Sequence, residues 1–232
     1  MAIIVLGTIG LDNIKTPRGV RKKLLGGSAT HFAMGACLFT KVSIVSCVGE
    51  DFPERYLALL RKKRIDTSSI IIQKGSTFCW SGEYEKDFNQ AITKETYLGV
   101  FSSFRPFLNR RQRYIPYLFL ANLDPQIQLF LLKKMHSPRL VALDSMNYWI
   151  DNKCIALLKL LKKVDIYFAN EQEAKSLSGE LSVVKAAKAL VKIGAKMVLI
   201  KKGEHGALFY NGENFFVLPA YPVDEIVDPT GN

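Results

Sequence analysis

The sequence is poor in the side chains that build metal centres and disulfide frameworks. It contains four cysteines and three histidines among 232 residues. No two cysteines stand in a C-x-x-C pair, the spacing typical of zinc sites and redox motifs. A chain of this length buries enough apolar surface to fold without disulfides, so we expect reduced, buried thiols, as in cytoplasmic proteins.

Long apolar runs are absent as well. No stretch approaches the roughly 18 apolar residues of a membrane-spanning helix, which predicts a protein without a membrane partner. The first apolar run, Ala2–Leu6, is short and lacks a preceding basic segment, so it is expected to be a buried strand rather than part of a signal peptide. Low-complexity segments are missing too, and 48% hydrophobic against 23% charged residues indicate a folded chain.

Acidic residues are outnumbered by basic ones. The sequence has 32 Lys and Arg against 21 Asp and Glu, a net charge of +11. The basic clusters are scattered along the chain instead of forming one stripe, and solvated surface accounts for them without nucleic acid. Nucleic-acid binding is therefore the least favoured of three hypotheses, and the other two are given at the end of this section. A positive field would equally concentrate an anionic nucleotide near an enzyme's site.

Short apolar runs alternate with segments of helical spacing. The predicted strands are Ala2–Leu6, Val42–Val48, Tyr117–Ala121, Leu140–Leu143, Ile166–Ala169 and Met197–Ile200. The predicted helices are Thr30–Phe39, Pro53–Lys63, Pro125–Met135, Asn152–Lys162 and Val183–Ile193. Nearly continuous apolar strands separated by helices are typical of a parallel sheet that is covered on both faces. The predicted fold class is α/β, with a doubly wound, mostly parallel sheet.

Two segments depart from this alternation. From Thr77 to Leu98, aromatic and β-branched residues alternate with polar ones, which predicts two or three antiparallel strands in a small separate sheet. Such a sheet often acts as a lid over the substrate of an α/β enzyme. The second segment predicts a hairpin, with strands Ala207–Tyr210 and Asn214–Leu218 joined by a turn at Asn211-Gly212.

Polar residues follow the predicted strands at the points where they end. Asp12 comes soon after the first strand, and Asn122, Asp144 and Asn170 each stand at the end of a later one. Doubly wound sheets bind ligands beyond the carboxyl ends of their strands, so these residues are candidates for a binding site. The alternative is that all of them are ordinary turn residues.

Glycine-rich segments supply further candidates. Gly26-Gly27 precedes a predicted helix, whose free N–H groups suit a hydroxyl or anionic oxygen, although Ser28 could simply cap that helix. In Lys201–Ala207, glycines permit a turn close to a ligand and the lysines could face phosphate, whereas His205 is expected to be a loop residue. Asp228–Gly231 has the composition of a tight loop whose N–H groups could stabilise a transferring phosphoryl group.

Taken in order, these segments resemble the ribokinase-like (phosphofructokinase-B) family of carbohydrate and nucleoside kinases. The segments that carry the resemblance are GTIGLD, GGSATHFA, VGED, ANLDPQIQ, DSMNYWI, NEQEA, KKGEHGA and DPTG. The resemblance implies one ribokinase-like domain over residues 1–232, with lid strands at about 13–25 and 77–98. It also implies ATP-dependent phosphorylation of a hydroxyl on a sugar or nucleoside, with Mg²⁺ as the cofactor.

The resemblance further assigns roles to single residues. Those expected to bind substrate are Asp12, Gly26, Gly27, His31 and Asn122. Those expected to bind nucleotide are Asn170, Lys201, Gly203, Gly206, Asp228 and Thr230. Glu173 completes an N-x-x-E motif with Asn170 and is expected to organise magnesium through water, and Gly231 begins the anion hole.

The sequence departs from the family pattern in two places. His31 stands in a slot that often holds a sugar-contacting asparagine, which puts ordinary ribose recognition in doubt. Asn232 stands where the family has alanine, so the catalytic base is expected beyond it and the 232-residue chain itself is expected to be inactive. Two hypotheses follow: a kinase recorded without its C-terminal part, or a naturally shortened, non-catalytic sugar- or nucleoside-binding protein. A homodimer through the lid is open under both.

Overall fold

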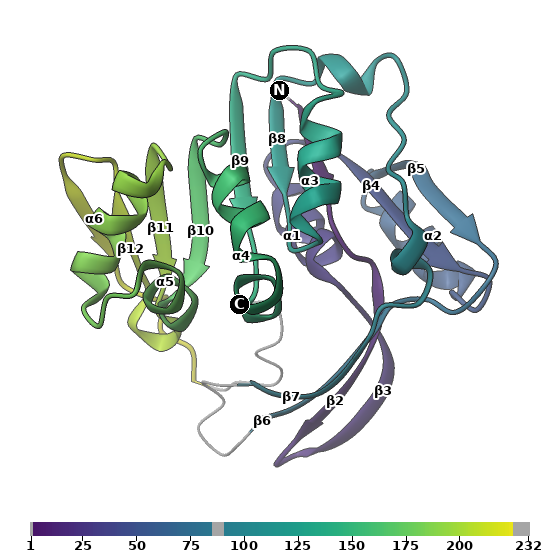
Figure 1. Cartoon of the computed structure of the whole chain (residues 1–232). Helices are drawn as coiled ribbons and strands as arrows, with labels where there is room; N and C mark the ends of the chain where they lie inside the picture. Colours follow the sequence, from purple (N-terminus) through teal and green to yellow (C-terminus); the bar gives the residue numbers. More distant parts are fainter. Residues whose placement is uncertain (1, 85–90, 225–232) are drawn as a thin grey trace. The chain divides into compact units, whose positions relative to one another are not determined.

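The computed structural model of the protein describes residues 2–84 and 91–224 (Figure 1). The chain divides into two units, of which unit 1 extends to Ile115 and unit 2 covers Pro116–Val223. Strands alternate with helices in each unit, as the periodicity of the sequence predicts. The loop Asp228–Asn232, with the expected roles of Asp228, Thr230 and Gly231, lies outside the described residues.

Unit 1 contains a parallel three-stranded arrangement in which β4 lies between β1 and β5. These strands are β1 (Ala2–Leu6), β4 (Lys41–Gly49) and β5 (Asp66–Gln73), and the helices that connect them are α1 (Ser28–Ala36) and α2 (Glu54–Lys62). Nearly every residue of β4 is buried, including Ser46, whose hydroxyl donates a 2.7 Å hydrogen bond to the carbonyl of Gly7. Burial on both faces explains why β4 is apolar almost throughout.

A separate four-stranded sheet also belongs to unit 1, with strand order β3-β2-β6-β7 (Figure 1). Its strands are β2 (Gly10–Thr16), β3 (Gly19–Gly26), β6 (Cys79–Tyr84) and β7 (Ala91–Tyr97). β2 pairs antiparallel with β3, and β6 pairs antiparallel with β7, whereas the central pair β2–β6 is parallel. We call this element the small sheet. The sequence does not predict that the central strands β2 and β6 are parallel, because that pairing joins two hairpins that lie far apart in the sequence.

Unit 2 holds four parallel strands in the order β8-β9-β10-β11, followed by an antiparallel hairpin at one edge. The strands are β8 (Tyr117–Leu120), β9 (Leu140–Asp144), β10 (Ile166–Asn170), β11 (Met197–Lys201), β12 (Ala207–Tyr210) and β13 (Phe215–Leu218). The helices are α3 (Pro125–Leu132), α4 (Asn147–Leu161), α5 (Glu171–Ser178) and α6 (Val183–Ile193). Short 3₁₀ turns occupy Gly99–Ser103, Gln112–Tyr114 and Gly203–His205.

Helix α4 differs most from its predicted bounds, because it begins at Asn147 rather than at Asn152. Its backbone is not helical at Lys153, where φ is −137° and ψ is 33°. The Lys153 ammonium group contacts the carboxylate of Asp124, which caps the start of α3 by accepting a 2.9 Å hydrogen bond from the N–H of Gln126. The break separates an aromatic first turn from the amphipathic remainder, and the sequence pattern detects only that remainder. None of the helices within the described residues is long and apolar enough to cross a membrane.

Candidate active site

The carboxyl ends of β9, β10 and β11 bring charged residues together in unit 2. Phe168 of β10 is in register with Asp144 of β9, and Asn170 is in register with Lys201 of β11. The ammonium nitrogen of Lys201 lies 4.0 Å from Oδ1 of Asp144. That carboxylate oxygen is buried and accepts no hydrogen bond from any residue that the structure describes. Lys201 therefore places a positive charge beside a carboxylate that the fold has largely removed from water.

The first turn of α5 places a second carboxylate at the same strand ends. Asn170 and Glu173 form a reciprocal capping box: Oδ1 of Asn170 accepts from the N–H of Glu173 at 2.7 Å, and Oε2 of Glu173 accepts from the N–H of Asn170 at 2.8 Å. Each side chain thus satisfies a backbone donor that the helix start leaves free. The N-x-x-E pattern has this local structural role whatever else it binds.

Burial raises the cost of ionising both carboxylates, and Asp144 adds to that cost at Glu173. Burial, and after it the charge of Asp144, raises the pKa of Glu173 to about 7, although the Asn170 N–H and Lys201 oppose this. Burial also raises the pKa of Asp144, against the opposing effect of Lys201. Ionisation of both carboxylates is therefore unfavourable at these strand ends, and a bound cation would offset that cost.

Asn122 follows β8 and is held by the start of α4. Its Oδ1 accepts a 2.9 Å hydrogen bond from the indole N–H of Trp149, and its Nδ2 lies 3.0 Å from the sulfur of Met146. Since an indole N–H only donates, it fixes which end of the Asn122 amide faces it. The sequence predicts Asn122 as a site residue but gives no sign of Trp149, which contacts it from 27 positions along the chain.

The segment after β11 forms a closed turn. Gly203 and Gly206 have φ values of 56° and 82°, and a Cβ at Gly206 would lie 2.0 Å from the carbonyl oxygen of Leu218. Lys202 donates its N–H to the Gly206 carbonyl at 2.8 Å, and His205 is exposed. Local geometry therefore accounts for both glycines, and their contact with a nucleotide stays a prediction.

In unit 1, the carboxylate of Asp12 lies directly over Gly26. A Cβ at Gly26 would lie 1.8 Å from Oδ2 of Asp12, so only glycine leaves room for this carboxylate in its position. Gly27, with φ of 94°, lets the backbone approach the carbonyl of Thr8, from which its own Cβ would be 2.4 Å away. The diglycine therefore shapes the surroundings of Asp12, which is 4% exposed.

The first backbone N–H groups of helix α1 already donate hydrogen bonds to another residue of the protein. The N–H of Ser28 donates to Oγ1 of Thr8 at 3.0 Å, and the N–H of Ala29 donates to the Thr8 carbonyl at 3.0 Å. Gly27 occupies the cap position, so the alternative in which Ser28 caps the helix is wrong. His31 lies half-buried in the first turn of this helix. Thr8, which the sequence did not single out, takes donors that we expected a substrate oxygen to use.

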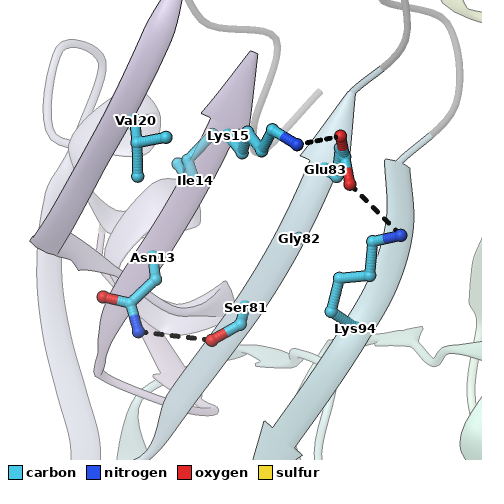
Figure 2. A pocket seen from close by; sticks show the side chains of 8 residues that line it. All are labelled: Asn13, Ile14, Lys15, Val20, Ser81, Gly82, Glu83 and Lys94. Carbon is cyan, nitrogen blue, oxygen red and sulfur yellow. Dashed lines mark hydrogen bonds and ion pairs between the residues drawn. The ribbon is translucent and has the colours of Figure 1, made fainter.

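The small sheet also bears a pocket that charged and apolar side chains line together, shown in Figure 2. Glu83 forms ion pairs with Lys15 at 2.7 Å and with Lys94 at 3.1 Å. The side-chain amide of Asn13 donates a 3.2 Å hydrogen bond to the Ser81 hydroxyl. Strand alternation places this pocket on the face opposite to Asp12, which precedes Asn13 by one residue. None of the predicted site residues lines it, and its charges are paired among themselves.

Comparison with known proteins identifies the family. Residues 117–232 match the protein family described as "pfkB family carbohydrate kinase". A cytidine kinase of Thermococcus kodakarensis is 31% identical over 236 residues, which cover 99% of this chain and 83% of the relative. The chain belongs to the pfkB family of carbohydrate kinases. An ATP-dependent 6-phosphofructokinase of Thermoanaerobacterium thermosaccharolyticum is 24% identical over 263 residues, covering 99% of this chain and 77% of that enzyme.

Solved structures show the same fold. A nucleoside kinase of Methanocaldococcus jannaschii, described as an archaeal member of the ribokinase family, superposes with a TM-score of 0.76 at 23% identity, covering 99% of this chain and 80% of that one. An adenosine kinase of Sinorhizobium meliloti gives a TM-score of 0.82 at 17% identity, covering 97% of this chain and 82% of that one. The predicted α/β, ribokinase-like fold with a small additional sheet is confirmed.

Proposed function

We propose that this protein binds a nucleoside and ATP, as a kinase that transfers the γ-phosphoryl group to a nucleoside hydroxyl. The observation that carries the proposal is the 31% identity, over 99% of the chain, to a protein named cytidine kinase. Solved proteins of similar fold support it, since one of them is a nucleoside kinase of Burkholderia thailandensis in complex with inosine. A sugar substrate is the second candidate, because a 6-phosphofructokinase also matches nearly the whole chain.

The small sheet supports a nucleoside by placing a carboxylate beside an aromatic ring. Gly10 pairs with Phe78, and Asn13 pairs with Ser81, at the same offset along β2 and β6. Asp12 and Trp80 therefore stand opposite each other on neighbouring strands and point to the same face. A carboxylate suits the vicinal hydroxyls of ribose, whereas an indole offers a flat apolar surface for a base.

Trp80 is held flat against this face. A Cβ at Gly82 would lie 2.0 Å from the Trp80 ring, so the missing side chain of Gly82 makes room for the indole. The indole N–H donates to the hydroxyl of Thr93 at 3.1 Å, which fixes the ring in its plane. Trp80 is only half-buried, and stacking of a base on such a ring contributes about 1–3 kcal/mol. We assign the nucleobase to Trp80 and the ribose hydroxyls to Asp12.

The strand ends of unit 2 supply the charges that a magnesium-bound nucleotide requires. No three acidic, cysteine or histidine side chains gather into a metal-binding group within residues 2–84 and 91–224. Mg²⁺ commonly uses one or two carboxylates, with water and phosphate completing its shell. Oδ1 of Asp144 accepts no hydrogen bond among the described residues, and the pKa of Glu173 is raised; both fit such an ion, with Glu173 acting through water.

Phosphoryl transfer requires positioning and charge stabilisation more than covalent chemistry. Bound Mg²⁺ would neutralise phosphate charge, and Asp144 and Glu173 are the residues placed to hold it. The ammonium group of Lys201, partly exposed beside Asp144, is suited to contact phosphate oxygen. Asn122, held by Trp149, would orient a polar group of a ligand bound at these strand ends. Asn170 would act mainly by fixing Glu173.

The test is a binding panel measured by calorimetry. We expect cytidine, inosine or adenosine to bind more tightly than ribose or fructose 6-phosphate, and ADP to bind with Mg²⁺. Asp12→Asn and Trp80→Leu should each weaken nucleoside binding about tenfold, a loss close to 1.4 kcal/mol. Ser81→Ala, on the same strand but facing away, is the matched control and should leave the affinity unchanged.

Each outcome decides between the candidates. Binding of a sugar without any nucleoside would replace the proposal with the sugar alternative, and binding of neither would reject both. Equal losses in Ser81→Ala and Trp80→Leu would show that the predicted face is wrong. The negligible turnover that the sequence predicts for the 232-residue chain is tested in the same samples. Formation of a nucleoside monophosphate at an enzyme-like rate would refute that expectation.

A further inference from the structure

One buried glutamine joins the ends of two strands that carry predicted site residues. Gln128 lies on α3 and is 0% exposed. Its Nε2 lies 2.9 Å from the carbonyl oxygen of Ala121, 3.2 Å from that of Asp144 and 3.3 Å from that of Leu120. All three partners are backbone acceptors at the carboxyl ends of β8 and β9.

These contacts take over where the sheet stops. The β8–β9 ladder ends at the pair Leu120–Leu143, so Ala121 and Asp144 lie just beyond it. Neighbouring strands are free to separate once their ladder of hydrogen bonds ends. Here the single amide group of Gln128 bridges the backbones that follow both strands. Because carbonyl oxygens only accept, the NH₂ end of the Gln128 amide must face them.

The two bridged backbone segments carry two residues of the candidate site. Ala121 immediately precedes Asn122, and the Asp144 carbonyl belongs to the residue whose carboxylate faces Lys201. The other end of the Gln128 amide, Oε1, is buried and accepts no hydrogen bond among the described residues. The polar contacts of this side chain are therefore directed to the two strand ends.

We propose that Gln128 is a positioning residue of the phosphoryl-transfer site, which sets the separation between Asn122 and Asp144. This inference rests on the proposed function, since it requires that both residues act on bound ligands. Gln128 touches neither ligand; it acts through the backbone of the residues that do. Displacement of positioning groups by about an ångström can change activity by about a hundredfold, so the contact does not need to reach the ligand itself.

The test replaces Gln128 by methionine, which keeps a similar length and removes the amide. Val164→Ala is the matched control: Val164 is 2% exposed and lies two residues before β10, at the opposite end of the strands from the site. For both variants we measure the midpoint of urea unfolding, the affinity for Mg²⁺ with ADP, and the indole N–H resonance of Trp149. A Trp80→Phe background leaves Trp149 as the only tryptophan.

We expect Gln128→Met to weaken binding of Mg²⁺ with ADP about tenfold and to shift the Trp149 resonance, because the indole donates to Asn122. Val164→Ala should lower the unfolding midpoint without either change. If Gln128→Met does not fold, Gln128→Asn keeps the amide but withdraws it by one methylene group and serves the same comparison.

The outcomes separate the inference from the proposed function. If the wild-type chain binds neither nucleoside nor nucleotide, the proposed function fails and the inference fails with it. If the wild-type chain binds both, and Gln128→Met matches Val164→Ala in affinity and in the Trp149 resonance, the inference alone is refuted. A purely stabilising glutamine would give that second result.

Discussion

Neutralising Glu173 should change how stability depends on pH, because this side chain is buried with an unfavourable charge. Glu173 is 7% exposed, and burial together with Asp144 raises its pKa to about 7 from an ordinary value of 4.5. In Glu173→Gln the amide oxygen can still accept the hydrogen bond from the Asn170 N–H. The substitution therefore removes the charge while it keeps the cap of α5.

The direction follows from which state binds the proton more tightly. The folded protein holds the Glu173 proton up to about pH 7, whereas the unfolded chain releases it near pH 4.5. This contribution to stability is fully present below about pH 4.5 and is lost as the pH rises through about 7. A tenfold difference in proton affinity corresponds to about 1.4 kcal/mol, so the loss is about 3 kcal/mol at most.

The assay is urea unfolding at pH 5 and pH 8, followed by Trp149 fluorescence in a Trp80→Phe background. Between these two pH values the wild type should lose about 2–3 kcal/mol more than Glu173→Gln. Glu171→Gln is the matched control, since Glu171 is also in the first turn of α5 but partly exposed and paired with Lys175 at 2.6 Å. It should follow the wild type closely.

Magnesium extends the same prediction to function. With ADP present, Mg²⁺ should stabilise the wild type at pH 8 more than it stabilises Glu173→Gln, because the ion offsets the charge that the variant lacks. Parallel pH dependences of the wild type and Glu173→Gln would refute the reasoning about burial. A normal pH effect without any difference in the response to Mg²⁺ would leave Glu173 as a helix cap alone.

Two further substitutions test how the predicted ligand-binding side chains are held. Gly26→Ala should displace the Asp12 carboxylate, destabilise the protein by about 1–3 kcal/mol in thermal unfolding and weaken nucleoside binding in calorimetry at least as much as Asp12→Asn does. Gly35→Ala, in open space on α1, should be neutral or stabilising by up to about 1 kcal/mol, and an equal loss in both variants would contradict the argument. Trp149→Phe should cost about 0.5–1.5 kcal/mol and weaken ligand binding through Asn122; unchanged affinity would count against a role for Asn122.

The strands were predictable because burial on both faces leaves a clear record in the sequence. β1 matches its predicted bounds, and β4, β8, β9, β10 and β11 differ from theirs by one residue at one or both ends. β5 was not predicted, since Ser68 and Ser69 interrupt its apolar run. Helix α5 was also missed, because it is short and polar and starts from the capping box of Asn170 and Glu173.

The sequence could propose candidate site residues only where a strand end or a motif marks a single residue. The strand-end rule identified Asn122 and Asn170, and the family resemblance added Glu173. Asp144 was noticed at a strand end but not assigned to the site, because its importance depends on burial and on Lys201. The cytoplasmic location and a homodimer through the small sheet stay predictions.

Residues that act through contacts between distant segments could not be predicted from the sequence. Gln128 reaches the Asp144 carbonyl across 16 positions, and Trp149 reaches Asn122 across 27. Neither spacing repeats within a strand or helix, so periodicity cannot reveal it. A motif therefore identifies the residue that meets the ligand more readily than the residue that holds it. Gln128 becomes recognisable only in the structure, where its amide contacts backbone carbonyls at the end of the β8–β9 ladder.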